Sequence, residues 1–334
     1  MRPVSASVVA ASAASRRRDR VTEVPSVLGG GGGDRELGAL PISGRCFHRV
    51  PSLSIDPARC SAERPLAEGS GAPRTMSVIS YRQPSPRPGR LRPMTLKLRS
   101  VGASDRGLIR SGNQDAQHAG PWLVAVADGM GGMAAGDLAS RIAIDAIAPL
   151  DVETPEDALV AALQGAIELA TARIRQAVEE DPERQGMGTT LTALLFARTG
   201  SCLALAHVGD SRAYLFREGV LKQVTRDDTF VQMLVDQGVI TAEQASSHPR
   251  RAVVTQALQG DQVSPSYATM VPRAGDRWLL CSDGLSNVVR ADTLTEVLNE
   301  QMERDACAAR LIDLALRAGG PDNITVVIAD VVEE

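Results

Sequence analysis

The stretch Trp122-Leu-Val-Ala-Val-Ala-Asp128-Gly-Met-Gly-Gly132 is an apolar, β-forming run that ends in an aspartate and a glycine cluster. It predicts a strand that delivers a carboxylate to the rim of a sheet, on a turn where backbone can approach a ligand closely. The pattern recurs in Arg277-Trp-Leu-Leu-Cys-Ser-Asp283-Gly284, and Pro321-Asp322-Asn323 precedes a third apolar run. Three such aspartates are typical of a site for Mg²⁺ or Mn²⁺, which prefer oxygen ligands and neutralise converging carboxylates.

The charge of the 334-residue chain is divided unevenly. Residues 1–95 carry fifteen Arg, no Lys and seven acidic residues, a net charge of +8, whereas the remainder has a net charge of −12. The acidic part is suited to concentrating cations, and it argues against nucleic acid as the main partner. No stretch reaches the roughly 18 to 20 apolar residues of a membrane span, so we expect a soluble protein.

The five cysteines are odd in number and show no CxxC spacing. Cys202 and Cys281 lie in apolar, strand-like runs. We therefore expect buried free thiols in a reducing compartment and a cytoplasmic location.

Residues 1–95 form a leader rich in Arg, Gly, Pro and Ser, with a pentaglycine at 29–33. Few large apolar residues recur with any period, so we expect disorder. A secretory signal within residues 2–15, an organellar transit peptide, and a misannotated start with the natural one at Met76 or Met94 are alternatives. A phosphate-binding loop is excluded, because no Gly-Lys-Ser/Thr follows the glycines.

From Leu96 onward, short β-forming runs alternate with amphipathic helical segments. Thr154 and Pro155 have the positions of an N-cap and a first helical residue, whereas Asp115 is expected on an irregular segment. Because many strands follow one another without helices between them, we expect antiparallel sheets. The expected strands lie near residues 96–101, 122–128, 189–197, 202–208, 212–217, 220–224, 266–271, 277–282 and 324–332, and the expected helices near 134–148, 155–180, 292–300 and 304–318.

Six sequence blocks occur in a fixed order along the second part of the chain. They are Ser104-Asp-Arg-Gly-Leu-Ile-Arg110 with Asn113-Gln-Asp115, Asp128-Gly-Met-Gly-Gly132, Gly188-Thr-Thr190, His207-Val-Gly-Asp-Ser-Arg212, Cys281-Ser-Asp-Gly284 and Pro321-Asp-Asn-Ile-Thr325. Over roughly residues 98–332 the chain thereby resembles the bacterial form of the PP2C-type, metal-dependent Ser/Thr protein phosphatases. The resemblance implies an α+β fold, an α-β-β-α sandwich of two antiparallel sheets flanked by helices. Residues 96–334 would form the phosphatase domain, with a flap at about 226–260.

The resemblance also implies a metal site for two Mn²⁺ or Mg²⁺ ions. Asp128 would bridge both ions, with the carbonyl of Gly129 on the second, and Asp283 and Asp322 would hold the first. Asp210 matches a residue that, with Asp283, binds a third ion in bacterial relatives. The implied reaction is hydrolysis of phosphoserine and phosphothreonine in proteins, by direct attack of a metal-bridging water.

Other positions would serve the substrate and the metal-bound water. Arg110 matches the residue that grips the substrate phosphate, a task suited to the guanidinium fork, and Asp115 would orient a metal-bound water. Gln114 stands where the family usually has Glu, which would weaken the second metal. Met130 stands where eukaryotic relatives carry a general-acid His, and Met cannot donate a proton. Arg212 is expected in a structural ion pair and His207 in the packed core.

The resemblance further implies a monomer that acts on phosphoproteins, opposite a Hanks-type Ser/Thr kinase. A phosphoprotein-binding relative without turnover is an alternative, and Gln114 supports it. The segment 129–134 matches the loose dinucleotide fingerprint G-x-G-x-x-A, but Asp128 would aim its charge at the pyrophosphate. An esterase is excluded, because the chain lacks a Gly-x-Ser-x-Gly elbow.

Overall fold

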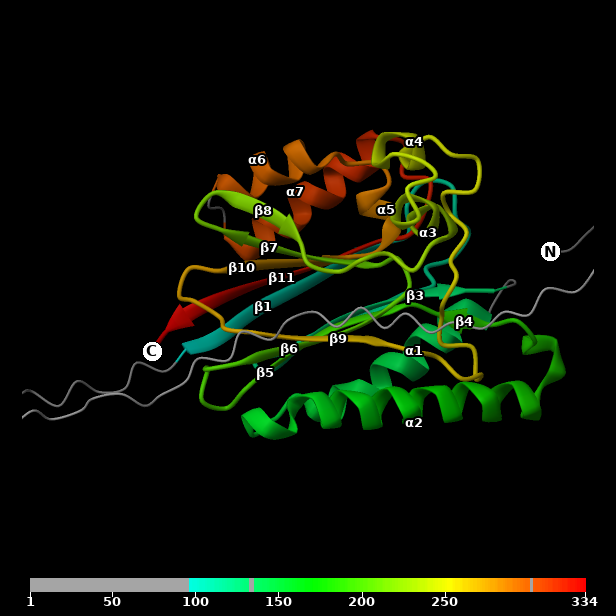
Figure 1. Cartoon of the computed structure of the whole chain (residues 1–334), viewed down its shortest axis with the longest axis horizontal. Coiled ribbons are helices and arrows are strands. Elements are labelled where there is room, and N and C mark those ends of the chain that lie inside the picture. Colours follow the sequence, from blue (N-terminus) through cyan, green and yellow to red (C-terminus); the bar gives the residue numbers. More distant parts are fainter. Residues whose placement is uncertain (1–95, 132–134, 301–302) are drawn as a thin grey trace, which may run out of the picture. The chain divides into compact units, whose positions relative to one another are not determined.

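The computed structural model describes residues 96–131, 135–300 and 303–334. The expectations for residues 1–95, which concern disorder, a targeting signal and the natural start, lie outside the described residues. In the described part, two antiparallel sheets lie face to face, with helices on the outer face of each (Figure 1). The predicted α+β sandwich is confirmed.

The first sheet has the strand order β1-β11-β10-β7-β8. Its two longest strands, β1 and β11, come from the two ends of the described chain and pair along their whole length. Leu96 lies opposite Glu333 at one end of the pair, and Asp105 lies opposite Ile324 at the other. Strand β11 is a nearly continuous apolar run, as expected for a strand buried on both faces. The strand bounds are β1 Leu96–Asp105, β7 Arg212–Arg217, β8 Val220–Gln223, β10 Arg277–Cys281 and β11 Ile324–Glu333.

The second sheet has the strand order β2-β3-β5-β6-β9, and the short β4 pairs with the end of β3. On β3, Leu123 and Ala125 face the helices, whereas Val124 and Val126 face the other sheet. The same period of two directs Asp128 into the space between the sheets. The strand bounds are β2 Asp115–Ala119, β3 Leu123–Met130, β4 Gly188–Thr189, β5 Leu191–Phe196, β6 Leu203–Val208 and β9 Ser266–Met270.

Helices cover the outer faces of the two sheets. Helices α1 and α2 pack on the second sheet through an apolar stripe that includes Ile147, Leu163 and Ile174, and α5, α6 and α7 pack on the first (Figure 1). The helix bounds are α1 Ala135–Ile147, α2 Leu159–Glu180, α5 Asp283–Ser286, α6 Ala291–Asn299 and α7 Arg304–Arg317. Single 3₁₀ turns occupy Ala148–Leu150, Glu156–Ala158 and Pro182–Arg184.

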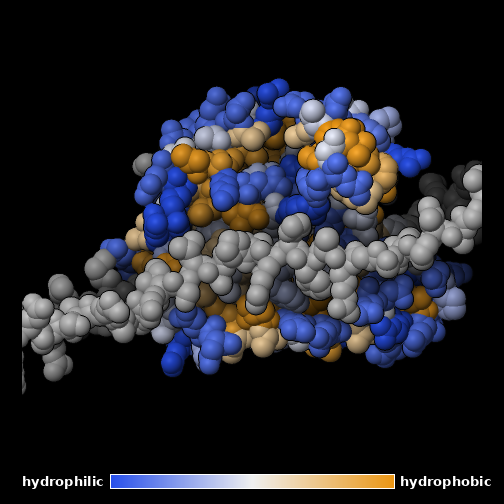
Figure 2. Space-filling view, in the orientation of Figure 1, coloured by the Kyte–Doolittle hydropathy of each residue, from blue (hydrophilic) through white to orange (hydrophobic). Residues whose placement is uncertain are grey.

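Helices α3 (Phe230–Asp236) and α4 (Ala242–Ser246) lie within residues 226–260, the segment that is expected to be the flap. Thr229 caps α3, and Thr241 and Gln244 close a capping box on α4, so both short helices have satisfied first turns. Figure 2 shows hydrophobic side chains gathered over this part of the chain, where Met233, Val239 and Val253 are exposed.

Three local expectations were wrong. Asp115 is the first residue of strand β2 rather than part of an irregular segment, because pairing with β3 imposes the extended conformation. Strand β3 continues through Asp128 to Met130, where it pairs with β4. The second helix begins at Leu159 after a 3₁₀ turn, and the hydroxyl of Thr154 bonds to the carbonyl of Val152 instead of capping a helix.

Three free cysteines in the described ranges, Cys202, Cys281 and Cys307, are buried, in agreement with the expected free thiols. No helix among the described residues is long and apolar enough to cross a membrane.

Candidate active site

Four aspartates from separate parts of the fold approach one another at one end of the sandwich, where the charges of Asp210, Asp283 and Asp322 act on Asp128. Asp128 lies on β3, Asp210 on the turn between β6 and β7, Asp283 at the start of α5 after β10, and Asp322 just before β11. Strands β10 and β11 pair with Cys281 opposite Val326, which brings the two flanking aspartates to the same edge. The structure thus brings the predicted ligands together.

Two glycines allow the backbones to meet at this edge. A Cβ on Gly284 would lie 1.9 Å from the carbonyl oxygen of Asn323, and one on Gly129 would lie 2.1 Å from the carbonyl oxygen of Gly136. A side chain at Gly284 would push Asp283 away from the segment that carries Asp322, and one at Gly129 would collide with the start of α1. The glycines that follow Asp128 and Asp283 are therefore packing requirements.

Burial and mutual repulsion disfavour the ionised carboxylates. Burial, and then the charge of Asp322, raise the pKa of Asp283 to about 6, and burial followed by Asp283 raises that of Asp210 to about 7. The pKa of Asp128 is raised well above its ordinary value by burial and then by Asp115 and the other aspartates. A bound cation would reverse this cost, because it favours the ionised forms.

The donor set fits hard cations. Asp115 Oδ1 and Asp283 Oδ1 are buried and have no hydrogen-bond partner. Such acceptors are costly unless something binds them. Among residues 96–131, 135–300 and 303–334, no group of three Asp, Glu, His or Cys side chains is already arranged so that it could hold a metal ion. The fit therefore rests on carboxylate chemistry, charge and orphaned oxygens.

Arg110 lies at the rim of the acidic cluster. Its Nη2 donates to Asp322 Oδ2 at 2.7 Å, and this bond raises the pKa of the guanidinium. The side chain of Arg110 is 50% exposed, so its remaining donors can reach a ligand. Asn323, which the sequence alone did not single out, holds the loop in place by donating to the carbonyls of Arg106 and Gly112.

Gln114 and Asp115 lie next to the cluster. Asp115 stands opposite Asp128 in the β2–β3 register and accepts a hydrogen bond from the hydroxyl of Ser282 at 2.8 Å. Burial raises the pKa of Asp115 to about 6. Gln114 lines a cavity of about 280 Å³ that Arg110 also lines, and its carbonyl accepts from the amide of Gly129.

A second cavity of about 270 Å³ is lined by residues of α3 and α4 together with Asp210 and Asp283. Arg212 also lines it and forms the expected ion pair, since its Nη2 lies 2.6 Å from Asp227 Oδ2. His207 is buried, as predicted. Met130 offers no donor, in line with the sequence.

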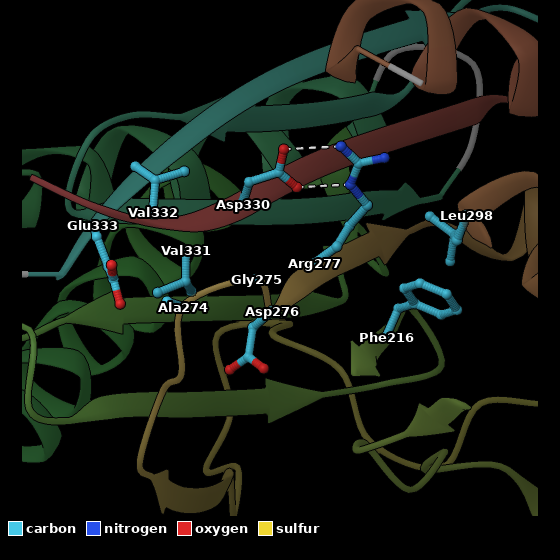
Figure 3. Close-up of a pocket in the computed structure, with 10 residues that line it drawn as sticks. All are labelled: Phe216, Ala274, Gly275, Asp276, Arg277, Leu298, Asp330, Val331, Val332 and Glu333. Carbon is cyan, nitrogen blue, oxygen red and sulfur yellow. Dashed lines mark hydrogen bonds and ion pairs between the residues drawn. The ribbon is translucent and has the colours of Figure 1, made fainter. Parts of the chain in front are cut away.

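A larger cavity of about 550 Å³ lies at the opposite end of the first sheet (Figure 3). Its wall contains Arg277, which donates to Asp330 from Nε at 2.7 Å and from Nη2 at 2.9 Å. Phe216 and Leu298 supply apolar surface. None of the clustered aspartates lines this cavity, so its size does not make it the reaction site.

Comparisons with known proteins agree with the geometry. Residues 109–314 match the family model described as Protein phosphatase 2C. The chain is 53% identical over 240 residues to the serine/threonine protein phosphatase PstP of Mycobacterium tuberculosis, which covers 72% of this chain and 46% of that protein. The chain thus spans about half the length of this curated relative. The protein phosphatase PhpP of Streptococcus pneumoniae is 33% identical over 69% of this chain and 96% of its own length.

Solved structures show the same likeness. The catalytic domain of PstP in complex with two manganese ions is 52% identical, has a TM-score of 0.67, and covers 71% of this chain and all of that one. PppA, a regulatory component of the type VI secretion system in Pseudomonas aeruginosa, is 35% identical with a TM-score of 0.64, over 70% of this chain and 97% of its own.

Proposed function

The chain belongs to the protein phosphatase 2C family, and we propose that it is a metal-dependent serine/threonine protein phosphatase. The observation that carries the proposal is the cluster of Asp128, Asp210, Asp283 and Asp322 at one end of the sandwich, where the buried Oδ1 atoms of Asp283 and of the neighbouring Asp115 lack hydrogen-bond partners. The catalytic unit is residues 96–334, with the flap at about 226–260. The relative that was solved with two manganese ions supports the same cofactor here.

Each acidic residue has a distinct task in this proposal. Asp128 and the carbonyl of Gly129, together with Asp283 and Asp322, would hold two Mn²⁺ or Mg²⁺ ions. Asp210 and Asp283 would hold a third. The cations supply Lewis-acid polarisation of the phosphoryl group and activation of water at neutral pH.

The chain's own residues hold the substrate and orient the water. The guanidinium of Arg110 is positioned by Asp322 and donates to two phosphate oxygens at once. Asp115, whose Oδ2 accepts a hydrogen bond from the hydroxyl of Ser282, would accept a hydrogen bond from the attacking water and orient it. With no imidazole at Met130, the leaving alkoxide takes its proton from solvent at the site.

Phosphoproteins are the proposed substrates, and a Ser/Thr kinase supplies them. The chain works as a monomer. The buried free thiols suit a reducing compartment, which supports a cytoplasmic location.

Hydrolysis of a phosphothreonine peptide by the full chain, titrated with Mn²⁺, tests this function. We expect turnover in the wild type and a loss of at least about 10³-fold in Asp283→Asn, since a ligand to the metal is removed. Asp292→Asn, at a side chain that is 86% exposed, is the matched control and should retain full activity. Phosphopeptide binding without turnover at any Mn²⁺ concentration would instead support the non-catalytic alternative.

A further inference from the structure

Two sequence blocks have no task in the proposed chemistry, Gly188-Thr-Thr190 and the part of His207–Arg212 around the metal ligand Asp210. In the structure their polar side chains lie together. Thr190, Thr192, His207 and Ser211 are each no more than 1% exposed. Buried polar groups of this kind are costly unless each one is hydrogen-bonded.

These four residues form two hydrogen-bonded segments, one of which begins at Asp128, and Ser211 joins the segments through its side chain on one side and its backbone carbonyl on the other. The amide of Asp128 donates to Thr190 Oγ1 at 2.9 Å, and Thr190 Oγ1 lies 2.7 Å from Ser211 Oγ. Thr192 Oγ1 lies 2.8 Å from the carbonyl oxygen of Ser211 and 2.9 Å from His207 Nδ1. We name Thr190, Ser211, Thr192 and His207 the buried relay.

The far end of the buried relay reaches the root of the flap. His207 Nε2 lies 3.1 Å from the carbonyl of Arg226. Two residues later, Asp228 is hydrogen-bonded to Gly209, in the turn that carries Asp210. The amide of Asp228 donates to the carbonyl of Gly209 at 2.7 Å, and Asp228 Oδ2 accepts from the amide of Gly209 at 3.0 Å. The relay therefore joins the flap root to the backbone of Asp128.

The hydroxyl of Thr192 has one proton but two possible acceptors, His207 Nδ1 and the carbonyl of Ser211. A carbonyl can only accept, so His207 Nε2 carries the ring proton towards Arg226. Burial lowers the pKa of His207, against the charges of Asp228 and Asp227, which favours a neutral ring with Nδ1 as an acceptor. The hydroxyl of Thr192 then donates either to His207 Nδ1 or to the carbonyl of Ser211. This is a discrete two-state element, the kind of element that can couple two sites.

We propose that the buried relay couples the flap root to Asp128, with Thr192 as the residue that links the two ends. This proposal rests on the proposed metal site. A metal ion on Asp128 favours one arrangement of the Thr192 proton, and that arrangement fixes the carbonyl of Arg226 and the start of the flap. The relay residues are positioning residues, since they touch neither metal nor substrate.

If the metal site and the flap root are coupled, metal binding must affect the flap root, and the flap root must affect metal affinity by the same factor. Both effects can be measured. In the full chain, Mn²⁺ should slow amide hydrogen exchange at residues 226–229 by about fivefold or more, the equivalent of one hydrogen bond. In Thr192→Val, which keeps shape and burial but lacks the hydroxyl, Mn²⁺ should bind about five- to tenfold more weakly and leave exchange at the flap root unchanged. Thr192→Ser restores the hydroxyl and should restore both effects.

A matched control separates coupling from a general loss of packing. Thr171 is a buried threonine of α2 whose hydroxyl bonds only to the carbonyl of Ile167, so Thr171→Val is the same substitution outside the relay. It should leave both Mn²⁺ affinity and Mn²⁺-dependent protection within about twofold of the wild type.

Two outcomes separate the proposals. If Mn²⁺ binds the wild type and Thr192→Val equally and protects the flap root equally in both, the relay is refuted while the phosphatase survives. If Mn²⁺ does not bind the wild type at all, the proposed function itself fails. If Thr192→Val does not fold, Thr192→Ser with wild-type protection still supports the relay, and Thr192→Ser without protection refutes it.

Discussion

The stability of the metal-free protein should fall as the pH rises from 5 to 8. The Asp115 and Asp283 carboxyls have pKa values raised from 3.8 to about 6 in the folded chain. Between those values the folded state binds more protons than the unfolded state, so stability decreases with pH. The direction is opposite to that of a carboxylate held in an ion pair.

The size of this effect follows from the two pKa values. For one carboxyl that shifts from 3.8 to about 6, linkage gives a loss of about 1.4 kcal/mol in the free energy of unfolding between pH 5 and pH 8. Two such groups lose about 3 kcal/mol if they titrate independently, which is a Tm decrease of about 5 to 10 °C in a domain of this size. Repulsion between the groups spreads the change over a wider pH range.

Thermal unfolding of the chelated chain across this pH range measures the effect. Saturating Mn²⁺ should remove the slope, because the cations favour the ionised carboxylates. Asp283→Asn should reduce the slope, because one carboxyl with a raised pKa is removed, and should raise the Tm of the chelated protein at pH 8. Asp292→Asn should retain the full slope, since that side chain is exposed. Equal stability of the chelated wild type at pH 5 and pH 8, or an unchanged slope in Asp283→Asn, would refute the reasoning.

Three further substitutions have defined outcomes. Arg110→Ala should raise KM for a phosphopeptide by about 10- to 100-fold, because a charge-assisted phosphate contact is lost; unchanged steady-state kinetics would contradict its role. Gln114→Glu should tighten binding of the second Mn²⁺ in calorimetry, since it adds a carboxylate at the cavity that Arg110 also lines, and equal affinity would show that residue 114 does not serve the metal. Arg217→Ala should cost about 3 kcal/mol of stability in denaturant melts without altering kcat, because Asp276, only 1% exposed, loses its bidentate partner.

The strands that carry the aspartates could be predicted because their signals are local. The apolar run before Asp128 and the one before Asp283 each have the length and β-forming residues of a buried strand, and the structure has β3 and β10 there. The resemblance to PP2C-type phosphatases, which the six motifs carry, then implied which aspartates come together.

Other features could not be predicted because they depend on partners distant in the chain. Strand β2 has the sequence Asp-Ala-Gln-His-Ala, which lacks β-branched residues, and it is extended because it pairs with β3. Asn323 holds the loop that carries Arg110, and only the fold brings the two segments together. The cap signals at Thr154 and Pro155 were misleading, since a 3₁₀ turn intervenes before α2.

The central claim is that the clustered aspartates bind the metal ions that hydrolyse the phosphate ester. The most direct measurement is a titration of the chelated full chain with Mn²⁺, in which bound ions and phosphothreonine peptide hydrolysis are followed on the same sample. We predict no turnover without metal, full turnover only once two ions are bound per chain, and loss of both binding and turnover in Asp128→Asn. Turnover that persists in chelator, or that survives in Asp128→Asn, would contradict the account.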